Sequence, residues 1–137
     1  MRVLIDTNVI LDVLLNRLEF LEFSVAVLKR LWERQFRGYV AATTLTNIYF
    51  IVRRATRNTE EAMTAVDKTL QWCAVAPVNR RVLDAARFAD MKDFEDAVQA
   101  AAAKNAGIDI VVTRDKTGFL DSGLRVYSPE EFVEAMK

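Results

Sequence analysis

The chain has 137 residues, in which 19 Lys+Arg balance 19 Asp+Glu, and it contains no histidine. This length predicts a single domain, residues 1–137, that is large enough to bury a core. The missing histidine excludes Ser-His and Cys-His nucleophile pairs and His-ligated zinc or haem, and the lone Cys73 excludes an internal disulfide and favours a reducing compartment. A net charge of zero argues against coating nucleic acid through bulk electrostatics.

The N-terminal segment MRVLIDTNVILDVLLNR is the part of the chain that most resembles a targeting signal. Asp6, Asn8 and Asp12 interrupt it, so it is too short and too polar for a signal peptide or a membrane-spanning helix. No other apolar run approaches about 20 residues. We therefore expect a cytoplasmic protein with no membrane contact.

Short β-rich segments alternate with longer segments of helical spacing along the chain. The first half predicts strand 3–5, helix 9–16 capped by Thr7 or Asn8, helix 20–37 ended by Gly38, strand 39–42, helix 44–54, and helix 59–72 started by Asn58. The second half predicts strand 74–78, helix 80–89, helix 94–105 ended by Gly107, strand 110–112, strand 125–127 and a C-terminal helix opened by Pro129. Pro77 places strand 74–78 near an edge of the sheet, because proline cannot donate to the ladder.

This alternation is typical of an α/β fold, with a parallel sheet, helices on both faces and right-handed crossovers. In such folds the functional crevice lies outside the carboxyl ends of the strands. Four acids are candidates for that crevice. Asp6 and Asp115 follow the first strand and the strand at 110–112, and Asp93 and Asp96 open the helix that precedes the latter.

Carboxylates that converge in one crevice repel one another and resist ionisation, and a divalent cation relieves that repulsion. Oxygen ligands without His or Cys indicate Mg²⁺ or Mn²⁺. Each acid also has a purely structural interpretation. Asp6 and Asp115 could be turn residues, and Asp93 could cap its helix with Asp96 at the third position. Asp12 lies inside the first predicted helix, and we interpret it as solvated or as paired with an arginine such as Arg17.

Three ordered motifs resemble those of PIN-domain proteins, of the kind found as VapC-like toxins of bacterial toxin–antitoxin pairs. RVLIDTNVILDVLL resembles the first family motif, DFEDAVQAAAA resembles the motif that carries the central metal-binding acid at Asp96, and IVVTRDKTGF places the fourth acid at Asp115. The ending SPEEFVEAMK is also similar to that of the family. The resemblance spans nearly the whole chain. It implies a PIN-like α/β/α sandwich with a central, mostly parallel sheet of about five strands.

The resemblance implies a metal-dependent endoribonuclease, the toxin of a type II toxin–antitoxin system. Asp6, Asp96 and Asp115 would be the catalytic residues and would hold one or two Mg²⁺ or Mn²⁺ ions, while Asn8 and Thr113 would orient the carboxylates. The implied partners are an RNA substrate, a cognate antitoxin that covers the crevice, and a second copy of the chain in a homodimer.

The sequence departs from the family pattern in two places. The family usually has a glutamate on the helix after the second strand, and the matching residue here is Asn47, which offers a carbonyl oxygen but no charge. Asp93 is the candidate for the missing carboxylate. Gly118 stands where many relatives have an acid. The alternative function is therefore a catalytically weak or inactive PIN-like module that binds RNA or protein.

A phosphatase that uses Asp6 as its nucleophile fits poorly. Such an enzyme would need a second aspartate two residues later, where this chain has Asn8, and the four glycines form no phosphate-binding loop.

Any RNA contact must be local, because the net charge is zero. Arg53, Arg54 and Arg57 cluster at the end of helix 44–54, and Arg114 lies beside Asp115, so these arginines are candidates for phosphate contacts. Arginines at the end of a helix also complement its dipole, which is the structural alternative. Six aromatic residues are expected mostly in the core, with some free to form a partner surface: Phe20, Phe23, Trp32, Phe36, Tyr49 and Phe50.

Overall fold

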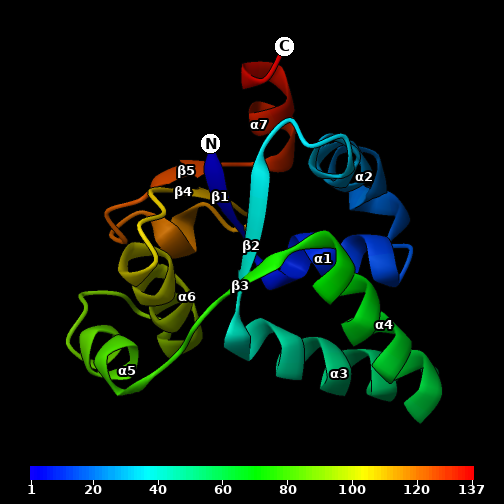
Figure 1. The fold of residues 1–137 in the computed structure, drawn as a ribbon, viewed down its shortest axis with the longest axis horizontal. Helices are drawn as coiled ribbons and strands as arrows, with labels where there is room; N and C mark the ends of the chain where they lie inside the picture. Colours follow the sequence, from blue (N-terminus) through cyan, green and yellow to red (C-terminus); the bar gives the residue numbers. More distant parts are fainter.

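The computed structural model describes residues 1–137, and its centre is a five-stranded parallel sheet in the order β3-β2-β1-β4-β5 (Figure 1). All four strand pairings are parallel, and the expected α/β/α sandwich is confirmed. β3 lies at an edge, as Pro77 predicted, and it ends before that residue. The strands are β1 (Arg2–Ile5), β2 (Arg37–Ala41), β3 (Ala74–Ala76), β4 (Ile110–Val112) and β5 (Arg125–Tyr127).

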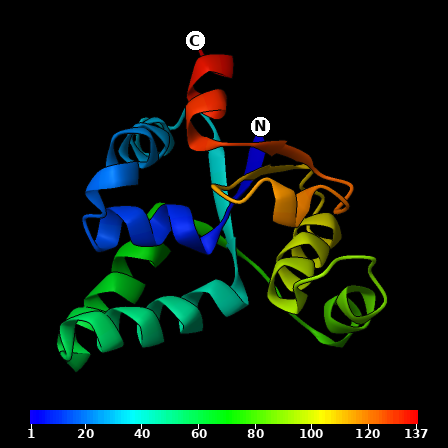
Figure 2. The ribbon, with the colours of Figure 1, turned by 180° about the vertical axis from the view of Figure 1, so that it is seen from behind.

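Helices cover both faces of the sheet (Figures 1 and 2). One face carries α1 (Thr7–Leu14), α2 (Leu18–Trp32), α3 (Ala42–Thr56), α4 (Thr59–Trp72) and α7 (Pro129–Ala135). The other carries α5 (Arg80–Arg87), α6 (Phe94–Asn105) and the short 3₁₀ helix η1 (Thr117–Phe119). None of these helices is long and apolar enough to cross a membrane.

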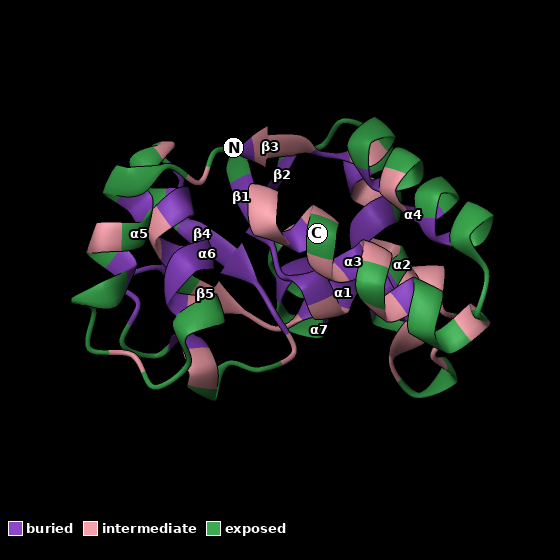
Figure 3. Cartoon of the chain, turned by 90° about the horizontal axis from the view of Figure 1, so that it is seen from below, coloured by how far each residue is buried: buried purple, intermediate pink, exposed green.

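The central strands read as continuous apolar runs because both of their faces are covered. In β1, Val3 and Ile5 pack on the α1–α4 side while Leu4 packs against α6 on the other, as alternate side chains of a strand must. All three are fully buried, and Figure 3 shows burial concentrated in the central strands and the inner helix faces. This packing holds the carboxyl end of β1 rigidly in the middle of the molecule.

Two predicted helix caps are wrong, and several other helix ends lie about two residues from their predicted positions. α2 ends at Trp32 rather than at residue 37, and Arg34 makes the turn with a left-handed φ of 60°. Gly38 is not a cap but lies inside β2, where a Cβ atom would come within 2.8 Å of the Leu31 side chain. The N-cap of α1 is Asp6 rather than Thr7 or Asn8, and its side chain makes no capping bond.

The aromatic residues divide between core and surface. Phe36 is buried against Phe132, with ring centroids 5.0 Å apart, as expected for a core residue. Trp32, Phe50 and Phe23 are 71%, 60% and 37% exposed, so these three are surface residues rather than core residues. Phe20 and Tyr49 are half-buried. The exposed rings are therefore available to contact other molecules.

Charges are separated between the two ends of the strands. β1, β2 and β5 each begin with an exposed arginine: Arg2, Arg37 and Arg125. Asp6 and Asp115 follow the opposite ends of β1 and β4. Because all strands are parallel, the three arginines share one edge of the sheet and the two aspartates share the other, with Asp109, directly before β4, at the arginine edge.

Candidate active site

Asp6 lies at the centre of the carboxyl edge and is held by two side chains. It is only 3% exposed, and its backbone N–H donates to the carbonyl of Val112 on β4 at 3.0 Å. The Thr113 hydroxyl donates to Asp6 Oδ2 at 2.7 Å, and Gln99 Nε2 donates to Asp6 Oδ1 at 3.0 Å. Burial raises the pKa of Asp6, and the bonds from Thr113 and Gln99 work against that rise. The predicted orienting role of Thr113 is consistent with this geometry.

Gln99 is a functional candidate that the sequence did not single out. It is 1% exposed and lies on α6, where the sequence predicted only that it belongs to helix 94–105. Its Oε1 accepts from the Thr44 hydroxyl at 3.5 Å, and Thr44 is bonded to Thr7 at 2.8 Å. Gln99 stands three residues after Asp96, so a polar residue on the same helix face was the available signal.

Asp96 and Asp115 converge on Gly118. A Cβ atom on Gly118 would lie 2.7 Å from Asp96 Oδ2 and 2.7 Å from Asp115 Oδ2. The Asp115 carboxylate is oriented by the Gly118 N–H, which donates to Oδ1 at 3.2 Å, and the Asp115 N–H donates to the Thr113 hydroxyl at 2.9 Å. The two carboxylates therefore approach the same point beside Gly118, where a methyl group would be too close to both of them.

The carboxylates at this edge of the sheet repel one another strongly. The pKa of Asp96 rises from 3.8 to about 7, first because of burial and then because of the charges of Asp6, Asp93, Asp115 and Glu95. The charge of Asp115 also contributes to the raised pKa of Asp6. The four predicted acids are thus close enough to interact electrostatically, as expected for carboxylates that share a cation-binding site.

Asp93 caps α6, as its structural interpretation predicted. Its Oδ1 accepts from the Asp96 N–H at 2.9 Å, and its side chain is exposed. Its charge nevertheless raises the pKa values of Asp96 and Glu95. One oxygen of Asp93 is therefore engaged in the cap, and its proposed part in metal binding stays a prediction.

Asn47 is paired with a carboxylate that the sequence did not single out. Asn47 Nδ2 on α3 donates to Glu95 Oε1 on α6 at 2.6 Å. The pKa of Glu95 is raised by burial and by the charges of Asp93 and Asp6. Although α3 lacks the usual glutamate, α6 brings a carboxylate to the side chain at that position.

The donor set fits a hard divalent cation. Every candidate ligand is an oxygen, and the space above Gly118 faces two of the carboxylates. No three acidic side chains lie close enough together, as placed, to enclose an ion. Asp6 is held in place by its two hydrogen-bond donors, whereas Asp115 is exposed and Asp96 is half-buried. To surround an ion together with Asp6, the side chains of Asp96 and Asp115 would have to move towards it.

The remaining predicted residues lie around this site. Asn8 is half-buried in the first turn of α1, and no hydrogen bond joins its side chain to Asp6. Arg53 and Arg54 line a cavity of about 500 Å³ at the end of α3, together with Phe50, Arg57 and Thr59. No carboxylate forms an ion pair with these arginines.

Arg114 forms an internal ion pair. Its Nε donates to Asp12 Oδ2 at 2.7 Å, and its guanidinium lies 3.7 Å from the centroid of the Phe20 ring. Asp12 is fully buried and also accepts from the Ser24 hydroxyl at 3.1 Å, so its interpretation as solvated is wrong. The predicted pairing with Arg17 is present at 3.5 Å.

Comparisons with known proteins agree with the fold. The chain is 23% identical over 138 residues to "Ribonuclease VapC1" of Aquifex aeolicus, covering 97% of this chain and 94% of that protein. VapBC2 from Rickettsia felis, solved bound to a DNA fragment from its promoter, has a TM-score of 0.73 at 12% identity, over 93% of this chain and 98% of that chain. Mycobacterium tuberculosis VapC20, described as a Sarcin-Ricin loop cleaving toxin, has a TM-score of 0.67 at 17% identity, over 90% and 98%.

The family model of the PIN domain matches residues 2–117, which contain every acid of the carboxyl edge described above. Since this match covers most of the 137 residues, the chain belongs to the PIN domain family.

Proposed function

We propose that this protein is a metal-dependent endoribonuclease and the toxin of a type II toxin–antitoxin system. The observation that carries the proposal is the convergence of Asp96 and Asp115 over Gly118, beside the buried and doubly hydrogen-bonded Asp6. The names of the ribonuclease VapC1 and of the Sarcin-Ricin loop cleaving VapC20 support RNA as the substrate.

The three aspartates would hold Mg²⁺ or Mn²⁺, which when bound would activate water and stabilise the leaving oxygen of a phosphodiester. Asp6 would be the fixed ligand, because Thr113 and Gln99 orient both of its oxygens. Asp96, whose pKa is raised to about 7 by burial and neighbouring charges, would act as a ligand in its ionised form. Asn47 holds Glu95 at the rim, which places a further negative charge near the site.

We propose that RNA reaches the acids along α3. Arg53, Arg54 and Arg57 form an unpaired basic group on this helix, and Asn47, which contacts the rim of the acidic edge, lies less than two turns before Arg53. Arg114 is the weaker candidate for a phosphate contact, because Asp12 and Phe20 already engage its guanidinium.

The proposed partners are a cognate antitoxin and a second copy of the chain. The solved neighbours include VapBC toxin–antitoxin complexes, which supports the antitoxin. Exposed apolar side chains on α3, such as Phe50, offer contact area for either partner. Light scattering should give the mass of a homodimer; a monomeric mass at working concentration would contradict that part of the proposal.

The decisive experiment is cleavage of RNA with Mg²⁺ or Mn²⁺, compared with cleavage in EDTA and with the variants Asp6→Asn and Asp96→Asn. Both variants should lose cleavage while remaining folded. Asp67→Asn is the matched control, since Asp67 is an exposed α4 carboxylate without an ion pair. Cleavage that is unchanged in both site variants would refute the assignment.

An inactive PIN-like binding module remains the second candidate, and the observation in its favour is Asn47 in place of a carboxylate on α3. Calorimetry separates the two candidates. The nuclease requires Mn²⁺ to bind at millimolar concentration or below and the binding to disappear in Asp96→Asn, whereas the inactive module requires no binding in the unmodified protein.

A further inference from the structure

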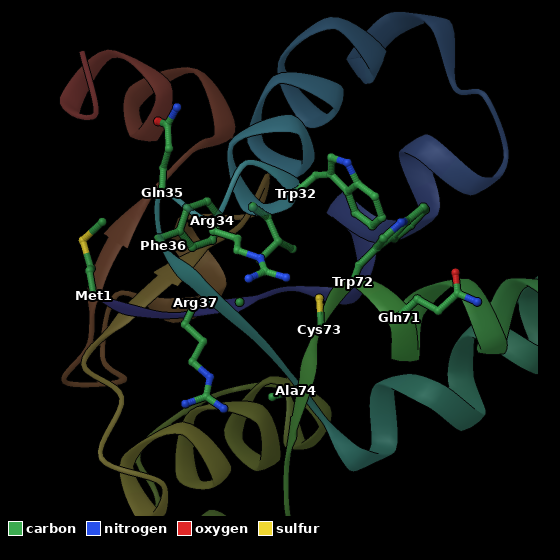
Figure 4. A pocket seen from close by; sticks show the side chains of 12 residues that line it. Met1, Trp32, Arg34, Gln35, Phe36, Arg37, Gln71, Trp72, Cys73 and Ala74 are labelled. Atoms are coloured by element: carbon green, nitrogen blue, oxygen red, sulfur yellow. The ribbon is translucent and has the colours of Figure 1, made fainter.

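A cavity of about 790 Å³ opens at the amino edge of the sheet, at the opposite end of the strands from the acids (Figure 4). Its walls come from the end of α2, the start of β2, and the junction of α4 with β3. Trp32, Arg34, Arg37 and Trp72 line it, together with smaller polar and apolar side chains. A cavity of this size is in the range that holds a small organic ligand.

The charge of this cavity is positive and unneutralised. Neither Arg34 nor Arg37 forms an ion pair, and no carboxylate is among the lining residues. The adjacent Glu33 is engaged by Lys29 and by Gln35. The cavity therefore offers the exposed Arg34 guanidinium for a bidentate contact with an anion, and Arg37 adds a second positive charge that no carboxylate neutralises.

The strand register increases this positive charge. Arg37 is paired directly with Arg2 on β1, and both guanidinium groups lie over the Tyr39 ring, at 5.7 and 5.1 Å from its centroid. Like charges directly opposite on neighbouring strands are destabilising. An anion bound at this edge would remove that repulsion.

The aromatic side chains that line the cavity indicate which kind of anion could bind there. The chain has two tryptophans, and both line this cavity. Trp32 is 71% exposed, so its indole face is open to a planar ligand. In the view of Figure 4 the Arg34 guanidinium lies between the two indoles and Arg37. An exposed indole beside an unpaired guanidinium group is a combination that binds a nucleobase together with its phosphate.

We propose that this amino-edge cavity binds a nucleotide, either free or as one unit of single-stranded RNA. The base stacks on the exposed Trp32 indole and Arg34 binds the phosphate, while Arg37, whose guanidinium lies over the Tyr39 ring on the α6 face of the sheet, adds positive charge at the same edge. The strands that separate the cavity from the acids have three to five residues, about 10–17 Å of chain, so a nucleotide here does not touch the acidic residues. The proposal is independent of the ribonuclease activity.

Intrinsic tryptophan fluorescence tests this proposal, because both fluorophores lie in the cavity. The full chain is titrated in EDTA with adenosine 5′-monophosphate, uridine 5′-monophosphate and a single-stranded oligoribonucleotide. We expect saturable quenching that weakens with added salt. Equal affinity for mononucleotide and oligonucleotide identifies a free nucleotide as the ligand, and much tighter binding of the oligonucleotide identifies RNA; both results support the proposal.

Variants give the matched comparison. Arg34→Gln combined with Arg37→Gln should weaken binding at least about tenfold, as expected for the loss of one charge-assisted contact and of a neighbouring positive charge. Arg87→Gln removes one charge from α5, on the other face of the sheet, and should leave binding unchanged. Asp96→Asn should also leave it unchanged, which separates this site from the acidic one.

Three outcomes would overturn the proposal. The first is no quenching at millimolar nucleotide, or equal quenching in the double arginine variant. The second is quenching by polyglutamate as strong as that by the oligonucleotide, which would indicate a surface for acidic peptides. The third is a fluorescence change that depends on protein concentration alone, which would indicate that a second copy covers the cavity.

Discussion

Replacing Asp96 by asparagine should stabilise the metal-free protein at neutral pH while removing its proposed function. The rise of the Asp96 pKa from 3.8 to about 7 corresponds to ~4 kcal/mol of disfavoured ionisation in the folded state. The side chain is half-buried, so solvent screening reduces this to about 2 kcal/mol. Asparagine also loses a favourable carboxylate in the first turn of α6, worth about 0.5–1 kcal/mol. The net gain is about 1 kcal/mol.

The pH dependence has a defined sign. In the folded state Asp96 keeps its proton up to pH of about 7, whereas in the unfolded state it loses the proton near 3.8. The folded state therefore binds more protons between these values, and the stability of the unmodified protein falls as pH rises through that window. The advantage of Asp96→Asn should be absent near pH 4, grow towards pH 7 and stay constant above it.

Thermal unfolding in EDTA at pH 4 and pH 8 measures this difference. About 1 kcal/mol corresponds to a rise in Tm of about 3–5 °C at pH 8 for a domain of this size. Millimolar Mn²⁺ should raise the Tm of the unmodified protein by mass action and leave that of the variant nearly unchanged, which reverses their order. Asp67→Asn should follow the unmodified protein throughout. A variant that is no more stable at pH 8, or equally stabilised at both pH values, would refute the reasoning.

Three further substitutions test the contacts around the site. Arg114→Ala leaves the fully buried Asp12 without its closest cationic partner. The free energy of unfolding in urea should therefore fall by about 3 kcal/mol, with partial recovery in Arg114→Lys. A loss below about 1 kcal/mol would show that the ion pair does not stabilise the fold. Gln99→Ala removes one of the two side-chain donors to Asp6, so Mn²⁺ affinity measured by calorimetry should fall about tenfold or more, and unchanged affinity would exclude its orienting role. Gly118→Ala puts a methyl group 2.7 Å from two carboxylates, so Mn²⁺ binding and cleavage should be lost with a change in Tm of only a few degrees; retained cleavage would show that the metal does not occupy this space.

Local sequence predicted the architecture and half of the site. Apolar runs marked β1 and β4. An acid directly after the first run marked Asp6 and an acid three residues after the second marked Asp115, because parallel strands bring their carboxyl ends to one edge. The capping position of Asp93 and the edge position of β3 also followed from local rules about helix starts and proline. These features depend on neighbours within a few residues, so the sequence alone carries them.

The end of α2 shows how packing overrides a local signal. Gly38 follows a helical stretch and resembles a C-cap, yet it is glycine because β2 runs against Leu31 with no room for a Cβ. The turn is made instead by Arg34 with φ of 60°. The sequence shows only that residue 38 is a glycine. It cannot distinguish a helix cap from a crowded strand position, because the atoms nearest the missing Cβ belong to Leu31 on α2.

Tertiary structure alone decided the partners of the functional side chains. Gln99 meets Asp6 across 93 residues of sequence, Glu95 meets Asn47 across 48, and Arg114 meets Asp12 across 102. No periodic pattern in the sequence indicates such pairs, because each pair depends on which helix packs beside which strand end. Sequence alone thus determined the fold class and indicated the main candidate acids, whereas the folded chain determined what holds these acids in place and which charged side chains share an edge of the sheet.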